Sequence, residues 1–294
     1  MKGPNPSKLK PINPRNHNRY VFSAMVHLFH KKIVPAHPSK LPVVVGRYFL
    51  GVPYQAKPLE GKGPERLVVN LRAFDCLTFV ETVLALTSWI QSRRGSFSAF
   101  RDLLRRIRYR GGRIEGYASR LHYFLDWLRD NERKGFLKDV TREIGGQPFK
   151  KAFCFMTTHR DLYPALMSPM TFQSMKAIER SLSRKVAYFL PREKWKAWEH
   201  RICDGDLIAF TTAVEGLDAE HVGFAVRVKG RIHFLHASSR EGKVVLSHET
   251  LRLHLTRRKT ATGLIVARPQ QRKWAPGLDS IHFARFEVSS SRKR

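Results

Sequence analysis

The feature that most constrains this chain is a change in the spacing of its apolar residues near Val186. Before that point, apolar residues recur with the period of a helix; after it, they alternate with polar residues in short runs bounded by glycine, aspartate or serine. A period near 3.6 favours helices, and a period of two favours strands with one buried face. Helices followed by consecutive antiparallel strands predict an α+β fold.

The spacing also predicts where the elements lie. Helices are expected at residues 20–33, from residue 76 onward, at 97–109 and at 119–135, where Ser119 is placed to cap the helix. Residues 41–54 form a short helix or an extended run. Strands are expected in the segments DLIAFTT, HVGFAVRV, RIHFLHASS, KVVLS and TGLIVARP, with a short helix in SHETLRLHL.

The chain is strongly basic, with 54 Lys and Arg against 24 Asp and Glu and a formal net charge of +30. Such a charge attracts polyanions, which include nucleic acids, anionic lipids and acidic wall polymers, or it belongs to an ordinary solvated surface. The sequence contains no zinc finger, no RNP-like aromatic strand and no basic zipper, which argues against nucleic acid as the partner. No segment is long and apolar enough to span a membrane, and the polar first residues lack the apolar core of an export signal.

Three cysteines are present, Cys76, Cys154 and Cys203, without a CxxC pair or a Cys/His cluster at zinc-finger spacing. We therefore expect no structural zinc and no other metal or cofactor. Because the count is odd, at least one thiol is free. Cys154 and Cys203 stand in no recognisable motif and are interpreted as packing or incidental residues.

Cys76 is placed differently, because it opens an apolar helix directly after Asp75. Asp75 is a good N-cap residue. A helix N-terminus stabilises a thiolate, whereas the neighbouring carboxylate opposes it, so a nucleophilic Cys76 needs a basic partner.

Two histidines on successive predicted strands can provide that partner. His221 opens the segment His-Val-Gly-Phe, where the small Gly223 allows close packing, and His236 ends the next strand. A hairpin would bring the two imidazoles together, so that His236 orients His221 as the base.

These motifs together resemble the NlpC-like cell-wall cysteine peptidases, whose fold is papain-like. The resemblance rests on Asp-Cys before an apolar helix, Gly-Asp-Leu-Ile at 205–208, His-Val-Gly, and His-Ala-Ser-Ser, and it covers residues 54–269. It implies an N-terminal helix carrying the cysteine, packed on an antiparallel sheet. The interval from Cys76 to His221 is far longer than in compact members, which implies a large helical insertion at about residues 96–185.

Further motifs resemble one branch, the N-acetylmuramoyl-L-alanine amidase-like family of bacterial envelope proteins. They are Val-Val-Asn-Leu-Arg-Ala-Phe before Asp75, Ser-Arg-Leu-His-Tyr at 119–123, and Gly-Leu-Asp before His221. The resemblance implies one domain at 41–270 between a basic arm with a helix (1–40) and a basic tail (271–294). It also implies action on peptidoglycan or muropeptides in the cell envelope or periplasm, while the lack of a visible export signal leaves a cytoplasmic location open.

The same resemblance implies a site. Cys76 is the nucleophile, His221 the base and His236 the third polar residue, cleaving the amide between muramic acid and L-alanine. Residues expected to touch substrate are Tyr54, beside the thiol, Asp75, and a polar cluster on the helix of the insertion, Arg120, His122 and Tyr123.

Three alternatives remain open. The same thiol chemistry could cut a D-glutamyl peptide bond or transfer an acyl group. The site could also be decayed, leaving a non-catalytic module that binds anionic polymers through its basic surface.

Overall fold

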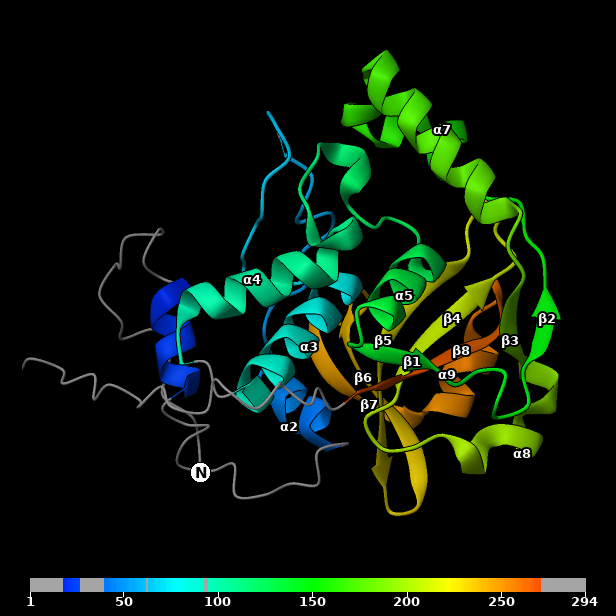
Figure 1. The fold of residues 1–294 in the computed structure, drawn as a ribbon. Helices are drawn as coiled ribbons and strands as arrows, with labels where there is room; N and C mark the ends of the chain where they lie inside the picture. Colours follow the sequence, from blue (N-terminus) through cyan, green and yellow to red (C-terminus); the bar gives the residue numbers. More distant parts are fainter. Residues whose placement is uncertain (1–17, 27–39, 62, 93–94, 271–294) are drawn as a thin grey trace, which may run out of the picture.

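The computed structural model describes residues 18–26, 40–61, 63–92 and 95–270 of the chain (Figure 1). Residues 18–26 are helical, and the remainder of the helix expected at 20–33 lies outside the described residues. The further α-helices are α2 (Leu41–Arg47), α3 (Cys76–Ser92), α4 (Phe97–Arg108), α5 (Phe124–Arg133), α6 (Phe155–Thr158), α7 (Pro169–Ser183), α8 (Trp195–Trp198) and α9 (Leu251–Arg257). The strands are β1 (Leu137–Asp139), β2 (Gln147–Phe149), β3 (Ala187–Pro191), β4 (Leu207–Thr212), β5 (Ala219–Val228), β6 (Arg231–Ser238), β7 (Lys243–Thr250) and β8 (Ala261–Pro269).

The strands form one antiparallel sheet in the described part of the chain. Its order is β2-β3-β8-β4-β5-β6-β7, and β1 pairs with β8 beside this path. Helices therefore precede most of the sheet, as expected, and the α+β prediction is confirmed. The five strands named from the sequence are all present, and the sheet gains β3 and the short β1 and β2.

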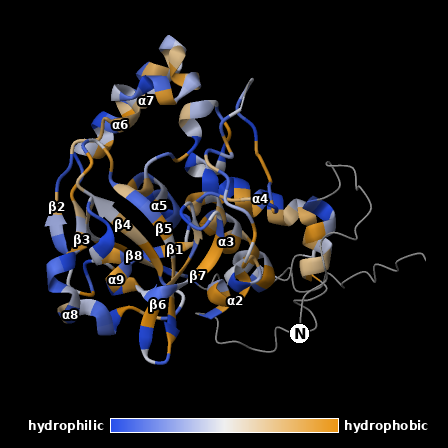
Figure 2. Cartoon of the chain, turned by 180° about the vertical axis from the view of Figure 1, so that it is seen from behind, coloured by the Kyte–Doolittle hydropathy of each residue, from blue (hydrophilic) through white to orange (hydrophobic). Residues whose placement is uncertain are grey.

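Alternate residues of the central strands face two separate hydrophobic cores. Along β4, Leu207 and Ala209 belong to the core that contains α3, whereas Ile208 and Phe210 belong to the core that contains α8 and α9. The central strands are thus buried on both faces, whereas the period of two predicted one buried face, because helices pack against both sides of the sheet. Figure 1 shows α3 and α5 close to the sheet, and Figure 1 and Figure 2 show α7 projecting from the body.

Helix α3 begins at Cys76 because Asp75 caps it. The Asp75 carboxylate accepts the Thr78 backbone N–H at 2.7 Å, and the Thr78 hydroxyl accepts the Asp75 N–H at 3.0 Å. This reciprocal pair satisfies two otherwise unpaired amides. Further along α3, Phe79 packs edge-on against Phe224 of β5, with ring centroids 6.1 Å apart. The cap and this packing fix the first turn of α3 against the sheet.

The stretch expected to be a helical insertion is not purely helical, since β1 and β2 lie within it and join the sheet. The predicted start of its second helix was also wrong. Ser119 ends a 3-10 turn, Tyr117–Ser119, where its hydroxyl donates to the Gly116 carbonyl, and α5 starts only at Phe124. Its first turn is capped instead by a distant residue, because the Leu125 N–H donates to the Asp218 carboxylate at 2.6 Å.

None of the helices described is long and apolar enough to cross a membrane. Helix α9 corresponds to the short helix expected in SHETLRLHL, although the first four residues of that segment still belong to β7. The Thr250 hydroxyl caps α9 by accepting the Leu253 N–H.

A buried ion pair joins α3 to α4. The Arg108 guanidinium donates to the Glu81 carboxylate at 2.6 Å and to the Val68 carbonyl at 2.5 Å, and both charged side chains are almost fully buried. Burial raises the pKa of Glu81, while Arg108 opposes that shift. Each of the two charges therefore compensates for the cost of burying the other.

We predict that Arg108→Ala destabilises the protein by about 3–5 kcal/mol, because it leaves Glu81 buried without a partner. The deficit should shrink as the pH is lowered, since Glu81 can then take up a proton. Urea denaturation at several pH values measures both effects. Arg105→Ala removes an exposed pair with Asp102 on the same helix and should cost no more than about 1 kcal/mol. Equal losses in the two variants would contradict the prediction.

Candidate active site

The two histidines singled out from the sequence do lie together. His221 on β5 and His236 on β6 are both buried, and the His221 Nε2 and His236 Nδ1 atoms are 2.7 Å apart. Their rings are nearly perpendicular, with centroids 4.8 Å apart. Because one nitrogen must donate and the other accept, the two imidazoles share one proton.

Gly223 makes this approach possible. A Cβ atom at this position would lie 2.6 Å from the Leu235 carbonyl oxygen and 2.8 Å from the His236 Cβ. The regular pairing of β5 with β6 ends at Phe224 and Leu235, just before this contact. The expectation that Gly223 permits close packing is thus confirmed, and the element that approaches is the strand carrying His236.

Cys76 meets β5 at the residue that follows His221. Burial raises the pKa of the Cys76 thiol to about 12, and the Asp75 charge adds to this shift. Hydrogen bonding from the Val222 backbone N–H, the Arg258 charge and the Leu77 N–H act in the opposite direction. The thiol therefore lies against the backbone of the histidine strand and is held mainly in its neutral form.

The imidazoles are also held neutral. The pKa of His221 is lowered well below its usual value by burial, by His236 and by the Arg258 and His254 charges. Burial, His254 and Arg258 lower the pKa of His236 to about 3, while a contact with the Ala237 carbonyl opposes them. The site of the free protein thus contains a neutral thiol and neutral imidazoles, and not a preformed thiolate–imidazolium pair.

Two residues near the site were missed by sequence reasoning. The His254 ring on α9 is 5.2 Å from that of His236, and the Arg258 guanidinium lies over the Phe210 ring at 5.1 Å while pairing with Glu220 at 3.0 Å. Both residues follow the His-Ala-Ser-Ser motif, in a segment whose many basic residues are typical of this chain. The one sequence signal for His254 was its position in the short helix expected after the strands that carry His221 and His236.

The three histidines also form the one His/Cys/Asp/Glu cluster in the described ranges with the spacing of a metal site, since a ligating atom from each lies within 4.8 Å of the others. Two features oppose a cation there. Zinc ligands in a tetrahedron stand about 3.3 Å apart, whereas the His221 and His236 nitrogens are bonded through a proton at 2.7 Å. The nearby Arg258 guanidinium repels a divalent ion. The residues fit a proton-sharing chain better.

Tyr54 lies within the electrostatic range of the thiol. Burial raises the pKa of Tyr54, and the charges of Cys76 and Asp75 add to this shift. The Asp75 carboxylate is engaged by Thr78 in the helix cap, so its position is fixed by α3.

The polar cluster expected on the insertion helix is not on a helix face, because α5 starts after it. Arg120 is buried and donates to the Glu60 carboxylate at 2.6 Å, and the Tyr123 hydroxyl is buried and donates to Glu179 at 2.7 Å. Both side chains are held by carboxylates of the chain itself and do not face solvent. The structure therefore does not support a substrate contact by either residue, and their expected role in binding stays a prediction.

His122 stands between these two residues and is partly buried. Its Nε2 lies 3.0 Å from the Tyr117 carbonyl, and its ring packs on that of Tyr117. Burial and the neighbouring Arg120 lower the pKa of His122 to about 3. The contacts make His122 a neutral packing partner of the turn that precedes α5.

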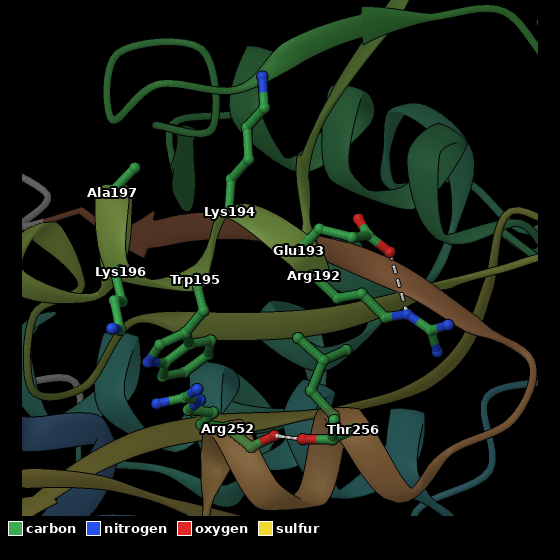
Figure 3. A pocket seen from close by; sticks show the side chains of 9 residues that line it. Arg192, Glu193, Lys194, Trp195, Lys196, Ala197, Arg252 and Thr256 are labelled. Atoms are coloured by element: carbon green, nitrogen blue, oxygen red, sulfur yellow. Dashed lines mark hydrogen bonds and ion pairs between the residues drawn. The ribbon is translucent and has the colours of Figure 1, made fainter.

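A cavity of about 450 Å³ lies at α8 and α9 and contains none of the residues expected to form the site (Figure 3). Its lining residues are Arg192, Glu193, Lys194, Trp195, Lys196, Ala197, Arg252, Leu255 and Thr256. The cavity is connected to the candidate site through helix α9. The residues of α9 that line it are packed near Trp195, while His254 of the same helix contacts His236.

We predict that iodoacetamide labels Cys76 slowly at neutral pH. Above neutral pH, the labelling rate should rise about tenfold per pH unit, without a plateau below pH 9, because the thiolate fraction grows with pH. Arg258→Met should lower the rate at each pH, since it removes a cation that favours the thiolate. Peptide mass spectrometry measures the labelling. Arg257→Met, which removes an exposed neighbouring cation, serves as the control. A plateau near pH 7 would show a preformed ion pair and contradict the prediction.

Comparison with known proteins gives a consistent family. The model of the N-acetylmuramoyl-L-alanine amidase-like family matches residues 44–262. The chain is 41% identical to a solved N-acetylmuramoyl-L-alanine amidase from Bacteroides uniformis, over 80% of this chain and 100% of that one, with a TM-score of 0.75. It is 40% identical to a Bacteroides fragilis protein described as a proposed xylanase, over 76% and 99% of the two chains, with a TM-score of 0.71.

A Legionella pneumophila protein shares the fold at 21% identity, over 88% of this chain and 97% of that one, with a TM-score of 0.65. No curated protein sequence matches the chain. The family match spans the segment from α2 to the start of β8 and so includes the thiol and all three imidazoles. The chain belongs to the N-acetylmuramoyl-L-alanine amidase-like family.

Proposed function

We propose that the protein is a cysteine amidase that hydrolyses the amide bond between N-acetylmuramic acid and L-alanine in peptidoglycan or its fragments. The observation that carries the proposal is the imidazole pair of His221 and His236, bonded at 2.7 Å on the strand whose next residue, Val222, contacts the Cys76 thiol. Family membership supports the choice of the amide bond between muramic acid and L-alanine, and the geometry of the site supports a cysteine mechanism. The core around α3 is, in this proposal, of the papain-like NlpC type.

The proposed reaction starts from the neutral site. Because His236 occupies the His221 Nε2, the Nδ1 atom of His221 is the one left to take the thiol proton as Cys76 Sγ attacks the lactyl carbonyl. The Cys76 backbone N–H is placed at the start of α3 to donate to the developing oxyanion. His221 then protonates the departing alanine nitrogen, and water hydrolyses the thioester to regenerate the thiol.

The Arg258 guanidinium acts on both partners of this proton transfer, because it favours the Cys76 thiolate and disfavours the His221 imidazolium. Proton transfer from thiol to imidazole creates a thiolate, which the Arg258 charge and the Val222 N–H favour, and an imidazolium, which the negative charge of the new thiolate favours. In this proposal Tyr54, whose pKa is influenced by Cys76, contacts the substrate. These charges form only during the reaction, so the stabilisation applies to the transition state more than to the resting site.

Glycoside hydrolysis, suggested by the description of one relative, needs two carboxyl groups on either side of the scissile bond. Among the residues described beside the thiol, the acidic group is Asp75, and its carboxylate caps α3. The site therefore favours amide chemistry. We place the reaction in the bacterial cell envelope, where the basic surface would also draw the protein to anionic wall polymers.

We predict that the wild-type protein releases free stem peptides from purified muropeptides and that Cys76→Ala reduces this release by at least about 10³-fold, because no nucleophile remains. His221→Gln should cause a similar loss. Liquid chromatography with mass spectrometry identifies the products, and circular dichroism confirms folding. Cys154→Ala is the matched control, because it removes a free thiol outside the site and should retain activity.

The product masses also separate the alternatives. Release of a peptide lacking its first two residues would indicate a D-glutamyl endopeptidase, and a product joined to an added amine would indicate acyl transfer. Absence of cleavage by the wild-type protein, together with salt-sensitive retention on anionic polymers, would replace the proposal with the binding-module alternative.

A further inference from the structure

The His236 Nε2 atom has no hydrogen-bond partner in the described structure, although it is fully buried. His236 as a whole is 2% exposed, so water does not reach this nitrogen freely. A buried polar atom without a partner costs about 1–3 kcal/mol. Such an atom next to a reacting imidazole calls for a functional explanation.

The proposed reaction determines which form of His236 is needed. For His221 to accept the thiol proton at Nδ1, its own proton must be on Nε2, where it is donated to the His236 Nδ1. A neutral His236 that accepts at Nδ1 carries its proton on Nε2. The reactive arrangement therefore places an N–H donor on Nε2, which makes no hydrogen bond in the described structure although the Ala237 carbonyl lies near the ring.

His254 is the polar ring placed to accept this proton. It stands edge-to-face with His236, with ring centroids 5.2 Å apart and planes at 74°, and a nitrogen of each of the three histidines lies within 4.8 Å of the others. A span of that size between ring nitrogens can be connected by one buried water or closed by rotation of the His254 side chain. The pKa of His254 is lowered to about 4 by burial and by Arg258, so its ring has a free lone pair at neutral pH.

The support of His254 is rigid. Helix α9 is capped by Thr250, and Leu251 and Leu255 are buried in the core that also contains Trp195. Figure 3 shows α9 beneath the Trp195 indole, with Arg252 and Thr256 on the side of the cavity. The Phe210 and Phe234 rings lie 5.6 Å and 5.5 Å from the His254 ring, so aromatic packing limits its motion.

We propose that His254 is a positioning residue that accepts the Nε2 proton of His236 and thereby holds His221 in the tautomer with a free Nδ1. Three imidazoles in series would then connect α9 to the thiol: His254 orients His236, and His236 orients His221. The proposal rests on the proposed function for the identity of the base, but the tautomers it specifies exist in the free protein.

The test compares His254→Phe, which keeps an aromatic ring without an acceptor, with His254→Gln, which keeps an acceptor. Long-range proton–nitrogen NMR of the full chain labelled at histidine nitrogens reports which ring nitrogen carries each proton. In the wild type and His254→Gln we expect His221 and His236 to be protonated at Nε2. In His254→Phe both protons should move to Nδ1, because the buried donor has lost its acceptor.

Activity on muropeptides gives the second readout. His254→Phe should lower kcat on the order of 10²-fold with little change in KM, since the wrong tautomer removes the base without removing binding contacts. His254→Gln should restore most of the loss. His248→Phe, an exposed histidine of the neighbouring strand β7, is the control and should leave both readouts unchanged. His254→Leu replaces the Phe variant should that variant not fold.

Unchanged tautomers in both the Phe and Leu variants would overturn the role of His254 even if the wild type is an active amidase. Conversely, a wild type that does not cleave muropeptides would overturn the proposed function, while the NMR comparison would still decide whether His254 sets the tautomers. The two failures are therefore distinguishable.

Discussion

The arrangement of the site depends on the close contact between β5 and β6 at Gly223. Any side chain there would collide with the Leu235 carbonyl and the His236 Cβ, so a larger residue would push the second histidine away from the first. The regular pairing of β5 with β6 ends at this point, although β5 still pairs with β4. The thiol at the start of α3 contacts the Val222 backbone in this part of β5. The absence of a side chain at Gly223 thus allows the approach of His236 on β6 to His221 on β5.

The insertion is tied to the same strand. Asp218 lies three residues before His221, and its carboxylate caps α5, while burial raises its pKa to about 6. Gly216, with a positive φ of 71°, lies so close to Cys154 and Phe155 that a Cβ would be 2.5 Å from the Phe155 nitrogen. The Gly-Leu-Asp motif therefore connects the insertion to β5, the strand that carries His221. The insertion helps define where β5 begins, in addition to covering the sheet.

Much of this could be predicted from the sequence, because the signals were local or came from contiguous motifs. The period of the apolar residues gave the order of helices and strands, and the pair His-Val-Gly and His-Ala-Ser-Ser predicted two imidazoles side by side. The failures have a common cause. Arg120 and Tyr123 looked available because their partners, Glu60 and Glu179, are about sixty residues away in the chain, and the cap of α5 came from Asp218 and not from the adjacent Ser119. Long-range polar partners leave no local pattern, which is also why His254 and Arg258 were missed.

The neutral thiol has a consequence for the durability of the protein. Oxidants attack the thiolate far faster than the thiol, so a cysteine whose pKa is near 12 resists conversion to sulfenic acid and to mixed disulfides. Under the proposed mechanism, the burial that makes Cys76 dependent on His221 therefore also protects it from oxidation between turnovers. Cys203 is exposed and lacks this protection. In an oxidising compartment, we expect Cys203 to be oxidised long before Cys76.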